Sequence, residues 1–149
     1  MLFRSLPGLP EGWVWAPFGE IVSDSLVGLD RNAGAQREGA NGTPYIKMNN
    51  ISMDGVVDTK DLVRTSVSTT ETVRYKVLPG DVLFNTRNSR ELVGKTGIVT
   101  DITGNTVFNN NILRLRFVGG INPEFSNFQM CSPVFRKNLE VERCCGLSR

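Results

Sequence analysis

The sequence predicts a mixed α+β domain in which short strands form a partly antiparallel sheet, together with a few short helices. The chain has 149 residues, the length of one domain and enough to bury a core. Its apolar residues occur in short runs separated by Gly, Pro and Asn, which is typical of short strands joined by turns. Two other segments begin with residues that favour a helix start.

Strands are expected where apolar residues alternate or cluster between turn residues. Residues 45–51 alternate, and residues 53–55 (Met-Asp-Gly) predict a turn before a short return strand at residues 56–57. The other predicted strands are residues 82–84, 96–100 and 111–117. Residues 101–105 indicate a hairpin-like connection between the last two.

Two helices carry clear start signals. Residues 70–75 follow Ser68, which can cap a helix by accepting a backbone hydrogen bond. Residues 124–130 follow Pro123, which suits the first helical position, and their two phenylalanines share one face. A further short helix is predicted in residues 134–143.

The N-terminal part of the chain is harder to assign. Trp13 and Trp15 alternate, so both side chains are expected on one strand face, where they anchor the N-terminus to the core. Base stacking is the alternative role for either ring. Residues 23–42 are polar and lack periodicity, which predicts a long exposed loop of a kind that is usually functional or disordered.

Composition excludes several classes of protein. Hydrophobic residues make up 40% and charged residues 21%, as in ordinary soluble domains. No apolar run is long enough to span a membrane, and no secretory signal is evident, so a cytoplasmic location without membrane contact is expected. Cys131, Cys144 and Cys145 have no zinc-ligand spacing and are expected to be reduced thiols, with Cys131 in a helix core.

Catalysis is not expected. The chain contains no His, and no nucleophile stands beside a base. Asp81, Glu91 and Lys95 superficially resemble the acidic-plus-lysine set of metal-dependent nucleases. The spacing from Glu91 to Lys95 is wrong for that motif, however, and Asp81 follows Pro-Gly as turn residues do. No cofactor or metal site is predicted.

Residues 85–97 instead predict a binding loop. Arg87, Arg90 and Lys95 stand against Glu91 alone, and the other side chains are mostly Asn, Ser and Thr. Arg can pair with guanine and Asn with adenine, while Lys and Ser hold phosphate oxygens. The alternative is a solvated hairpin loop in which Arg90 pairs with Glu91.

Two further groups of asparagines extend this hypothesis. Asn109, Asn110 and Asn111 stand at the start of a strand, where Asn is rare, and alternation sends Asn110 to the opposite face from the other two. At least one is expected to brace a neighbouring loop. Of the pair at residues 49 and 50, one is expected to cap a turn and the other to face a ligand. The predicted DNA-binding residues are Lys47, Asn49, Asn85, Arg87, Asn88, Ser89, Arg90, Lys95 and Asn110. Within this set, base contacts are assigned to Arg87, Asn88, Arg90 and Asn110, and phosphate contacts to Lys47, Ser89 and Lys95.

An ordered series of motifs runs through most of the chain. It comprises LPEGW at residues 9–13, PYIKMNNI at 44–51 with DG at 54–55, LPGDVLFN at 78–85, SRELVGKT at 89–96, FNNN at 108–111 and the helix between Pro123 and Pro133. In order and spacing the chain resembles the target-recognition domain of type I restriction–modification specificity subunits over about residues 9–139.

The resemblance implies a non-catalytic protein that reads double-stranded DNA. Such subunits usually carry two recognition domains, each followed by a long spacer helix, and each domain reads half of a split target. Partner modification subunits methylate adenine with S-adenosylmethionine, and restriction subunits cleave using ATP. By this resemblance neither cofactor binds the present chain, and its partners are DNA, those subunits or a second copy of itself.

One departure from the family pattern concerns the end of the chain. Residues 1–139 correspond to one recognition domain, and residues 140–149 to a tail that begins the spacer helix without continuing an apolar heptad. The chain is then a half-subunit, or a truncated remnant that acts only as a protein-interaction scaffold without DNA binding. Sequence preference is expected partly in residues 23–42 and 58–72.

Overall fold

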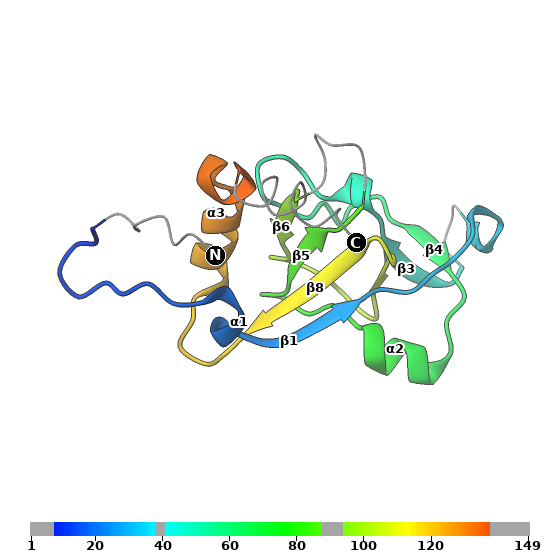
Figure 1. Ribbon diagram of the computed structural model, residues 1–149. Helices are drawn as coiled ribbons and strands as arrows, with labels where there is room; N and C mark the ends of the chain where they lie inside the picture. The colour runs from blue at the N-terminus through cyan, green and yellow to red at the C-terminus, as the bar shows by residue number, and fades with distance from the viewer. Residues whose placement is uncertain (1–7, 38–40, 88–93, 138–149) are drawn as a thin grey trace, which may run out of the picture.

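The computed structural model of the chain describes residues 8–37, 41–87 and 94–137. These residues form two four-stranded sheets with short helices around them (Figure 1). The strands are β1 (Val22–Val27), β2 (Gln36–Arg37), β3 (Thr43–Ile46), β4 (Val63–Thr65), β5 (Val82–Asn85), β6 (Thr96–Ile98), β7 (Val107–Phe108) and β8 (Ile112–Phe117). The helices are α1 (Phe18–Ile21), α2 (Thr69–Tyr75) and α3 (Pro123–Cys131), with 3-10 turns η1 (Ala33–Ala35) and η2 (Met48–Asn50).

The two sheets differ in topology. The first has the order β1-β8-β5-β6, and all its neighbours are antiparallel. The second has the order β2-β4-β3-β7, in which β3 and β7 are parallel and the other pairs antiparallel. The prediction of a mixed α+β fold with short, partly antiparallel strands is confirmed. Because β7 belongs to one sheet and β8 to the other, the three asparagines between them form the junction of the two sheets.

The main core lies between the sheets. Ile46 and Phe108 from the second sheet pack with Leu83 and Ile112 from the first, and all four are fully buried. The opposite face of the first sheet packs against α3 through Met130. Burial of each such side chain contributes about 1.5–3 kcal/mol of hydrophobic free energy before entropy is counted. The molecule therefore has three layers, with the first sheet in the middle.

Two arginines of β8 tie the first sheet to the turn before β5. The Arg116 guanidinium donates to both carboxylate oxygens of Asp81, at 2.6 and 3.0 Å, and Asp81 also accepts a hydrogen bond from the Leu78 backbone N–H at 2.8 Å. This pairing raises the pKa of Arg116. Arg114 donates to Asp24 at 2.8 Å and to the Lys76 carbonyl at 2.7 Å. Asp81 is thus a structural carboxylate, engaged in one ion pair and one turn.

The two helix predictions with clear start signals are confirmed. Ser68 Oγ accepts a hydrogen bond from Glu71 N, and the Glu71 carboxylate accepts one from Ser68 N, so a reciprocal capping box begins α2. Pro123 occupies the first turn of α3, and the Asn122 side chain caps it by accepting from Phe125 N at 3.0 Å. Of the helix predicted in residues 134–143, residues 133–137 are helical and the rest lies outside the described residues.

Three expectations from sequence are wrong. Residues 23–42 are not a long loop, because they contain β1 and β2; β1 is an edge strand whose exposed Ser and Asp residues conceal the strand pattern. Residues 101–105 are not a hairpin connection, because β6 pairs with β5 and the chain crosses to β7 beside β3. Trp13 and Trp15 lie in no strand and are 56% and 53% exposed, so they do not anchor the core.

The remaining expectations concern Cys131, metal sites and membranes. Cys131 is partly buried in α3, with its Sγ 3.7 Å from the Thr96 carbonyl. Within the described ranges, no cluster of His, Cys, Asp and Glu is placed to hold a metal ion. None of the helices in these ranges is long and apolar enough to cross a membrane.

A tight crossing after β1 generates a prediction about stability. A Cβ added to Gly28 would lie 2.3 Å from the Phe108 carbonyl oxygen and 2.4 Å from that of Asn109, and both are backbone atoms. We expect Gly28→Ala to lower the free energy of unfolding by at least about 2 kcal/mol, measured by urea denaturation, because the sheet junction must move apart. Gly19→Ala is the control, because nothing lies within 4 Å of its Cβ position. Equal stability of the two variants would contradict the close approach.

Candidate nucleic-acid interface

Three chain segments meet where the two sheets join. β3 ends at Ile46, whose carbonyl accepts a hydrogen bond from Asn109 N at 2.9 Å. β5 ends at Asn85, and the next residue, Thr86, donates its backbone N–H to the Asn111 carbonyl at 2.9 Å. The turn after β3, the segment after β5 and the asparagine turn between β7 and β8 therefore lie side by side. Sequence positions about 60 residues apart converge on one edge of the molecule, as the parallel β3–β7 pairing requires.

We call the predicted DNA-binding residues described at this junction the polar edge: Lys47, Asn49, Arg87, Lys95 and Asn110. Asn49 and Arg87 are exposed, and the other three are partly buried. Partial burial lowers the pKa of the Lys95 ammonium group. Asn88, Ser89 and Arg90 lie outside the described residues. The structure thus brings together residues from three separate motifs, and their contact with DNA stays a prediction.

Asn85 differs from the rest of the predicted set because its side chain is fully buried. Its backbone N–H donates to the Lys95 carbonyl at 2.9 Å, and its carbonyl accepts from Gly94 N at 3.0 Å. These two bonds close the base of the segment between β5 and β6. Asn85 is therefore too deeply buried to contact a ligand directly. It can affect binding only by positioning the segment between β5 and β6.

The asparagine turn is braced from the core side by Tyr45. The Asn109 amide donates to the Tyr45 hydroxyl at 2.9 Å, and that hydroxyl donates to the Leu29 carbonyl at 2.7 Å. Asn109 Oδ1 accepts from Asn111 N at 2.8 Å, which sets the turn. Burial raises the pKa of Tyr45. The expectation that one of the three asparagines is structural is confirmed, and that residue is Asn109.

Asn110 and Asn111 link the braced turn to its neighbours. Asn110 N donates to the Leu29 carbonyl at 2.9 Å, and Asn110 itself is partly buried. The Asn111 carbonyl accepts two hydrogen bonds from Thr86, from its N–H and its hydroxyl, each at 2.9 Å. Side-chain and backbone bonds thus run continuously from Tyr45 to the segment that carries Arg87.

One of the two roles expected for Asn49 and Asn50 is observed. Asn50 Oδ1 accepts a hydrogen bond from Lys47 N at 2.9 Å and so caps the η2 turn. Asn49 is exposed on the same turn. The capping role is confirmed, and contact of Asn49 with a ligand stays a prediction.

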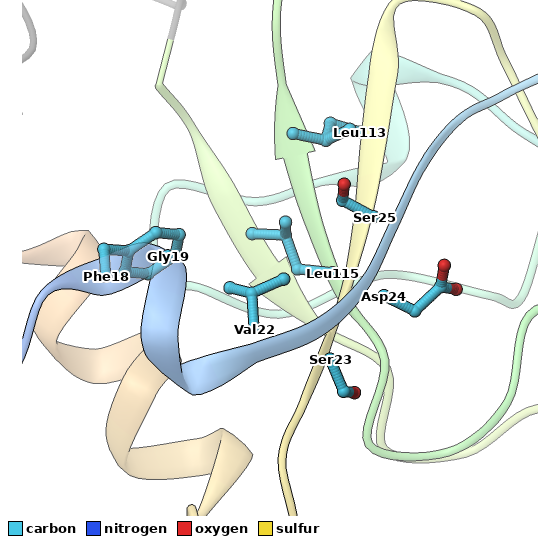
Figure 2. A pocket seen from close by; sticks show the side chains of 8 residues that line it. All are labelled: Phe18, Gly19, Val22, Ser23, Asp24, Ser25, Leu113 and Leu115. Carbon is cyan, nitrogen blue, oxygen red and sulfur yellow. The ribbon is translucent and has the colours of Figure 1, made fainter.

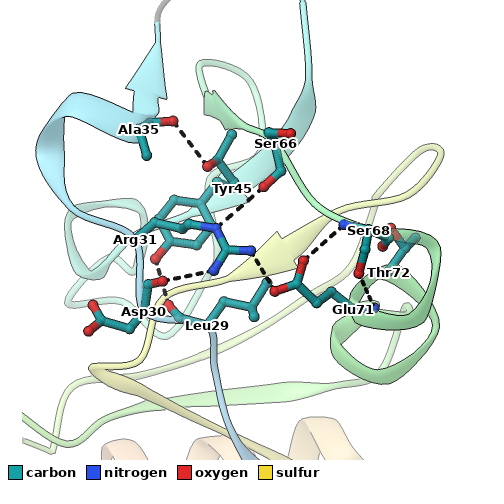
Figure 3. Close-up of polar contacts among 10 residues, drawn as sticks. Leu29, Asp30, Arg31, Ala35, Tyr45, Ser66, Ser68, Glu71 and Thr72 are labelled. Atoms are coloured by element: carbon teal, nitrogen blue, oxygen red, sulfur yellow. Dashed lines mark hydrogen bonds and ion pairs between the residues drawn. The ribbon is translucent and has the colours of Figure 1, made fainter.

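Sequence reasoning missed Arg31, which fixes the chain beside the junction (Figure 3). Its guanidinium donates to Glu71 Oε1 at 2.6 Å, to the Asp30 carbonyl at 2.9 Å and to the Ser66 carbonyl at 3.3 Å. The Arg31 hydrogen bond lowers the pKa of Glu71, and the Ser68 backbone N–H adds to the effect. Glu71 therefore both caps α2 and anchors the residues after Leu29. No local pattern reveals this pair, because its members are 40 residues apart.

The arrangement suits binding better than chemistry. The backbone is hydrogen-bonded at each of the three segments that carry the cationic and amide residues. Arg, Lys and Asn are the side chains that contact phosphates and base edges in DNA complexes.

Comparisons with known proteins agree with this architecture. No protein-family model matches the chain, and no curated protein matches it. Among solved structures, a chain from a study of complex assembly and conformational transition in the type I R-M system is 20% identical, with a TM-score of 0.62. It covers 85% of the present chain, which covers 29% of it. The HsdS subunit of Thermoanaerobacter tengcongensis is also 20% identical, with a TM-score of 0.60 and coverage of 84% and 28%.

These likenesses establish the fold of the chain. It is that of a segment of type I restriction–modification specificity subunits, in agreement with the resemblance read from the sequence motifs. The chain spans less than a third of the length of either solved chain.

The Tyr45 hydroxyl gives a second prediction. Tyr45→Phe leaves the Asn109 amide N–H without its buried acceptor and removes one of the two hydrogen bonds to the Leu29 carbonyl, which keeps the bond from Asn110 N, so we expect a loss of about 1–3 kcal/mol in the free energy of unfolding. Tyr75→Phe is a matched control, because the Tyr75 hydroxyl makes no hydrogen bond to the described residues. Urea denaturation of both variants measures the difference. If Tyr45→Phe is as stable as Tyr75→Phe, the hydroxyl does not brace the turn.

Glu71 gives a prediction about pH. Its pKa lies below the ordinary 4.5 in the folded chain, so its stabilising effect is complete above about pH 4.5 and is lost as the pH falls through the lower folded value. We expect Glu71→Gln to lower Tm at neutral pH, and the difference from the parent chain to vanish in acid. Glu11→Gln, at an exposed carboxylate, is the control. A difference that stays constant across this range would assign the loss to packing instead of charge.

Proposed function

We propose that the chain recognises double-stranded DNA in a sequence-specific manner, as part of the specificity subunit of a type I restriction–modification system. The proposal rests on the polar edge, where three segments that carry predicted DNA-binding residues converge. The fold that brings them together is shared with such subunits over 84–85% of the chain. In this role the chain is not an enzyme. It binds one half of a DNA target in the cytoplasm and directs the methylation and cleavage carried out by modification and restriction subunits.

The polar edge divides naturally into two kinds of contact. Arg87 and Asn110 carry planar groups with paired donors or a donor and an acceptor, which match guanine and adenine edges in the major groove. Lys47 and Lys95 carry point charges that suit phosphates. A phosphate beside Lys95 would favour its charged form and so oppose the effect of partial burial on its pKa. The asparagine turn ties together the backbone next to Lys47 and Arg87 before DNA arrives.

The length of the chain bears on its partners. A segment that corresponds to less than a third of a specificity subunit would read a half-site of few base pairs, which gives modest affinity. A second recognition domain, from a longer chain or a second copy, would supply the other half-site. Assembly with modification subunits would then add the contacts that raise affinity.

Selection from randomised duplex DNA tests the proposal directly. The purified chain is expected to enrich one short motif at low and at moderate salt. Binding without enrichment would contradict sequence-specific recognition. Absence of binding even at low salt would favour a scaffold fragment without DNA binding.

Two substitutions then separate the roles within the polar edge. Lys95→Ala is expected to weaken binding to all sequences and to reduce the slope of log K against log salt by about 0.9, as for one lost phosphate contact. Arg87→Ala is expected to relax preference at one base pair, with a cost of about 1–3 kcal/mol there. Lys137→Ala removes an exposed charge from the segment after α3 and is the control. If it weakens binding as much as Lys95→Ala, the polar edge is not the interface.

A further inference from the structure

Helix α3 buries two polar residues beside Met130 and exposes two phenylalanines. Its buried residues are Ser126, Asn127 and Met130, whereas Phe125 is 44% exposed and Phe128 is 70% exposed. Buried polar residues and exposed large apolar residues are the informative departures from the usual pattern of burial. The buried face has a structural explanation, because the Asn127 amide donates to the Gly55 carbonyl at 2.8 Å. The exposed face has none within the described part of the chain.

The exposed phenylalanines belong to a larger surface. The Trp13 ring lies 5.7 Å from the Phe125 ring, so Trp13 of the N-terminal segment packs against the outside of α3. Phe128 follows Phe125 by three residues and shares its helix face. We call Trp13, Trp15, Phe18, Phe125 and Phe128 the aromatic surface; each is 39–70% exposed. Figure 1 places α3 at the opposite end of the molecule from β3 and β4.

A hollow of about 400 Å³ adjoins the aromatic surface at Phe18 (Figure 2). Its apolar wall consists of Phe18, Val22, Leu113 and Leu115, and the exposed Asp24 lies at its polar side. Exposed apolar side chains beside a hollow of this size are typical of a protein-interaction site. An aromatic ridge next to a hollow offers an anchor and a pocket to an incoming side chain.

Acidic residues flank the aromatic residues in sequence, whereas the basic Arg136 and Lys137 follow Phe135, which packs against Phe18. Glu11, Glu20 and Glu124 each lie within two residues of one of its aromatic residues, and none forms an ion pair with a described residue. Asp24 pairs with Arg114 but keeps 48% of its side chain exposed. These carboxylates repel DNA phosphates. They also oppose a symmetric contact with a second copy, because that contact brings the same carboxylates together.

We propose that the aromatic surface binds an amphipathic helix of another protein, with an apolar face bordered by Lys or Arg. The ridge formed by Phe125 and Phe128 is one helical turn long and suits packing against a second helix. The basic border complements Glu11, Glu20 and Glu124. This surface is separate from the polar edge, so the inference stands whether or not the chain reads DNA.

The chain supplies its own reporter for this contact. Both of its tryptophans lie in the aromatic surface, so all Trp fluorescence comes from it. The probe is a synthetic amphipathic helix with Leu on one face and Lys on the other; a second peptide carries Glu in place of Lys. We expect the Lys peptide to shift the emission to shorter wavelength and to reduce quenching by acrylamide, and the Glu peptide to bind at least about tenfold more weakly.

Three substitutions make the test specific. Phe128→Asp is expected to weaken the Lys peptide at least about tenfold, as for the loss of an interface anchor, without change in the thermal unfolding curve. Glu124→Lys is expected to weaken the Lys peptide and strengthen the Glu peptide. Val73→Asp replaces an apolar residue of α2 that is 77% exposed, and is the matched control that leaves binding unchanged.

Four results would overturn the proposal. The first is that both peptides bind equally well or that neither binds, and the second is that Val73→Asp lowers peptide affinity as much as Phe128→Asp does. The third is that the chain self-associates and Phe128→Asp abolishes the self-association. The fourth is that duplex DNA protects the tryptophans from acrylamide quenching. The third would assign the surface to a second copy, and the fourth to nucleic acid. Loss of DNA binding in the Lys95 variant bears on the proposed function alone, so the two proposals fail separately.

Discussion

The structure depends on the buried hydrogen bonds that join its two sheets at Tyr45. The hydroxyl of this residue accepts from Asn109 and donates to Leu29, so one side chain links β3, the turn before β8 and the chain after β1. All these groups are buried or part of the backbone, where an unpaired donor or acceptor costs about 1–3 kcal/mol. The sheets are held in one relative position as a result. Every segment of the polar edge takes its place from that junction.

Local signals in the sequence predicted the elements that local interactions specify. The capping box of α2 and the Pro123 start of α3 need only neighbouring residues, and both were found. The strand β1 was missed because its exposed Ser23, Asp24 and Ser25 remove the apolar alternation that marks a strand. It is recognised only by its partner β8, about 90 residues later.

For the candidate interface, the sequence likewise indicated the residue types but not how their segments come together. Residue chemistry predicted Lys47, Arg87, Lys95 and Asn110 as binding residues. The parallel β3–β7 pairing, which no local pattern indicates, brings the segments of Lys47 and Asn110 together, and the pairing of β5 with β8 and β6 adds those of Arg87 and Lys95. The role of Arg31 escaped prediction because both its side-chain partner and its second carbonyl partner are distant in sequence. The expected burial of the tryptophans failed for a different reason. Aromatic residues usually enter the core, but Trp13 and Trp15 lie outside it and are more than half exposed.

The pairing of β1 with β8 has a consequence for biosynthesis. Val22 lies opposite Phe117, so β1 leaves the ribosome long before its partner strand exists. Domains whose contacts span such separations form late and expose unpaired strands in the meantime. The same Ser and Asp residues that conceal β1 from pattern analysis make it a poor template for intermolecular strand pairing during this interval. The nascent chain is thus protected by the feature that makes its first strand hard to recognise.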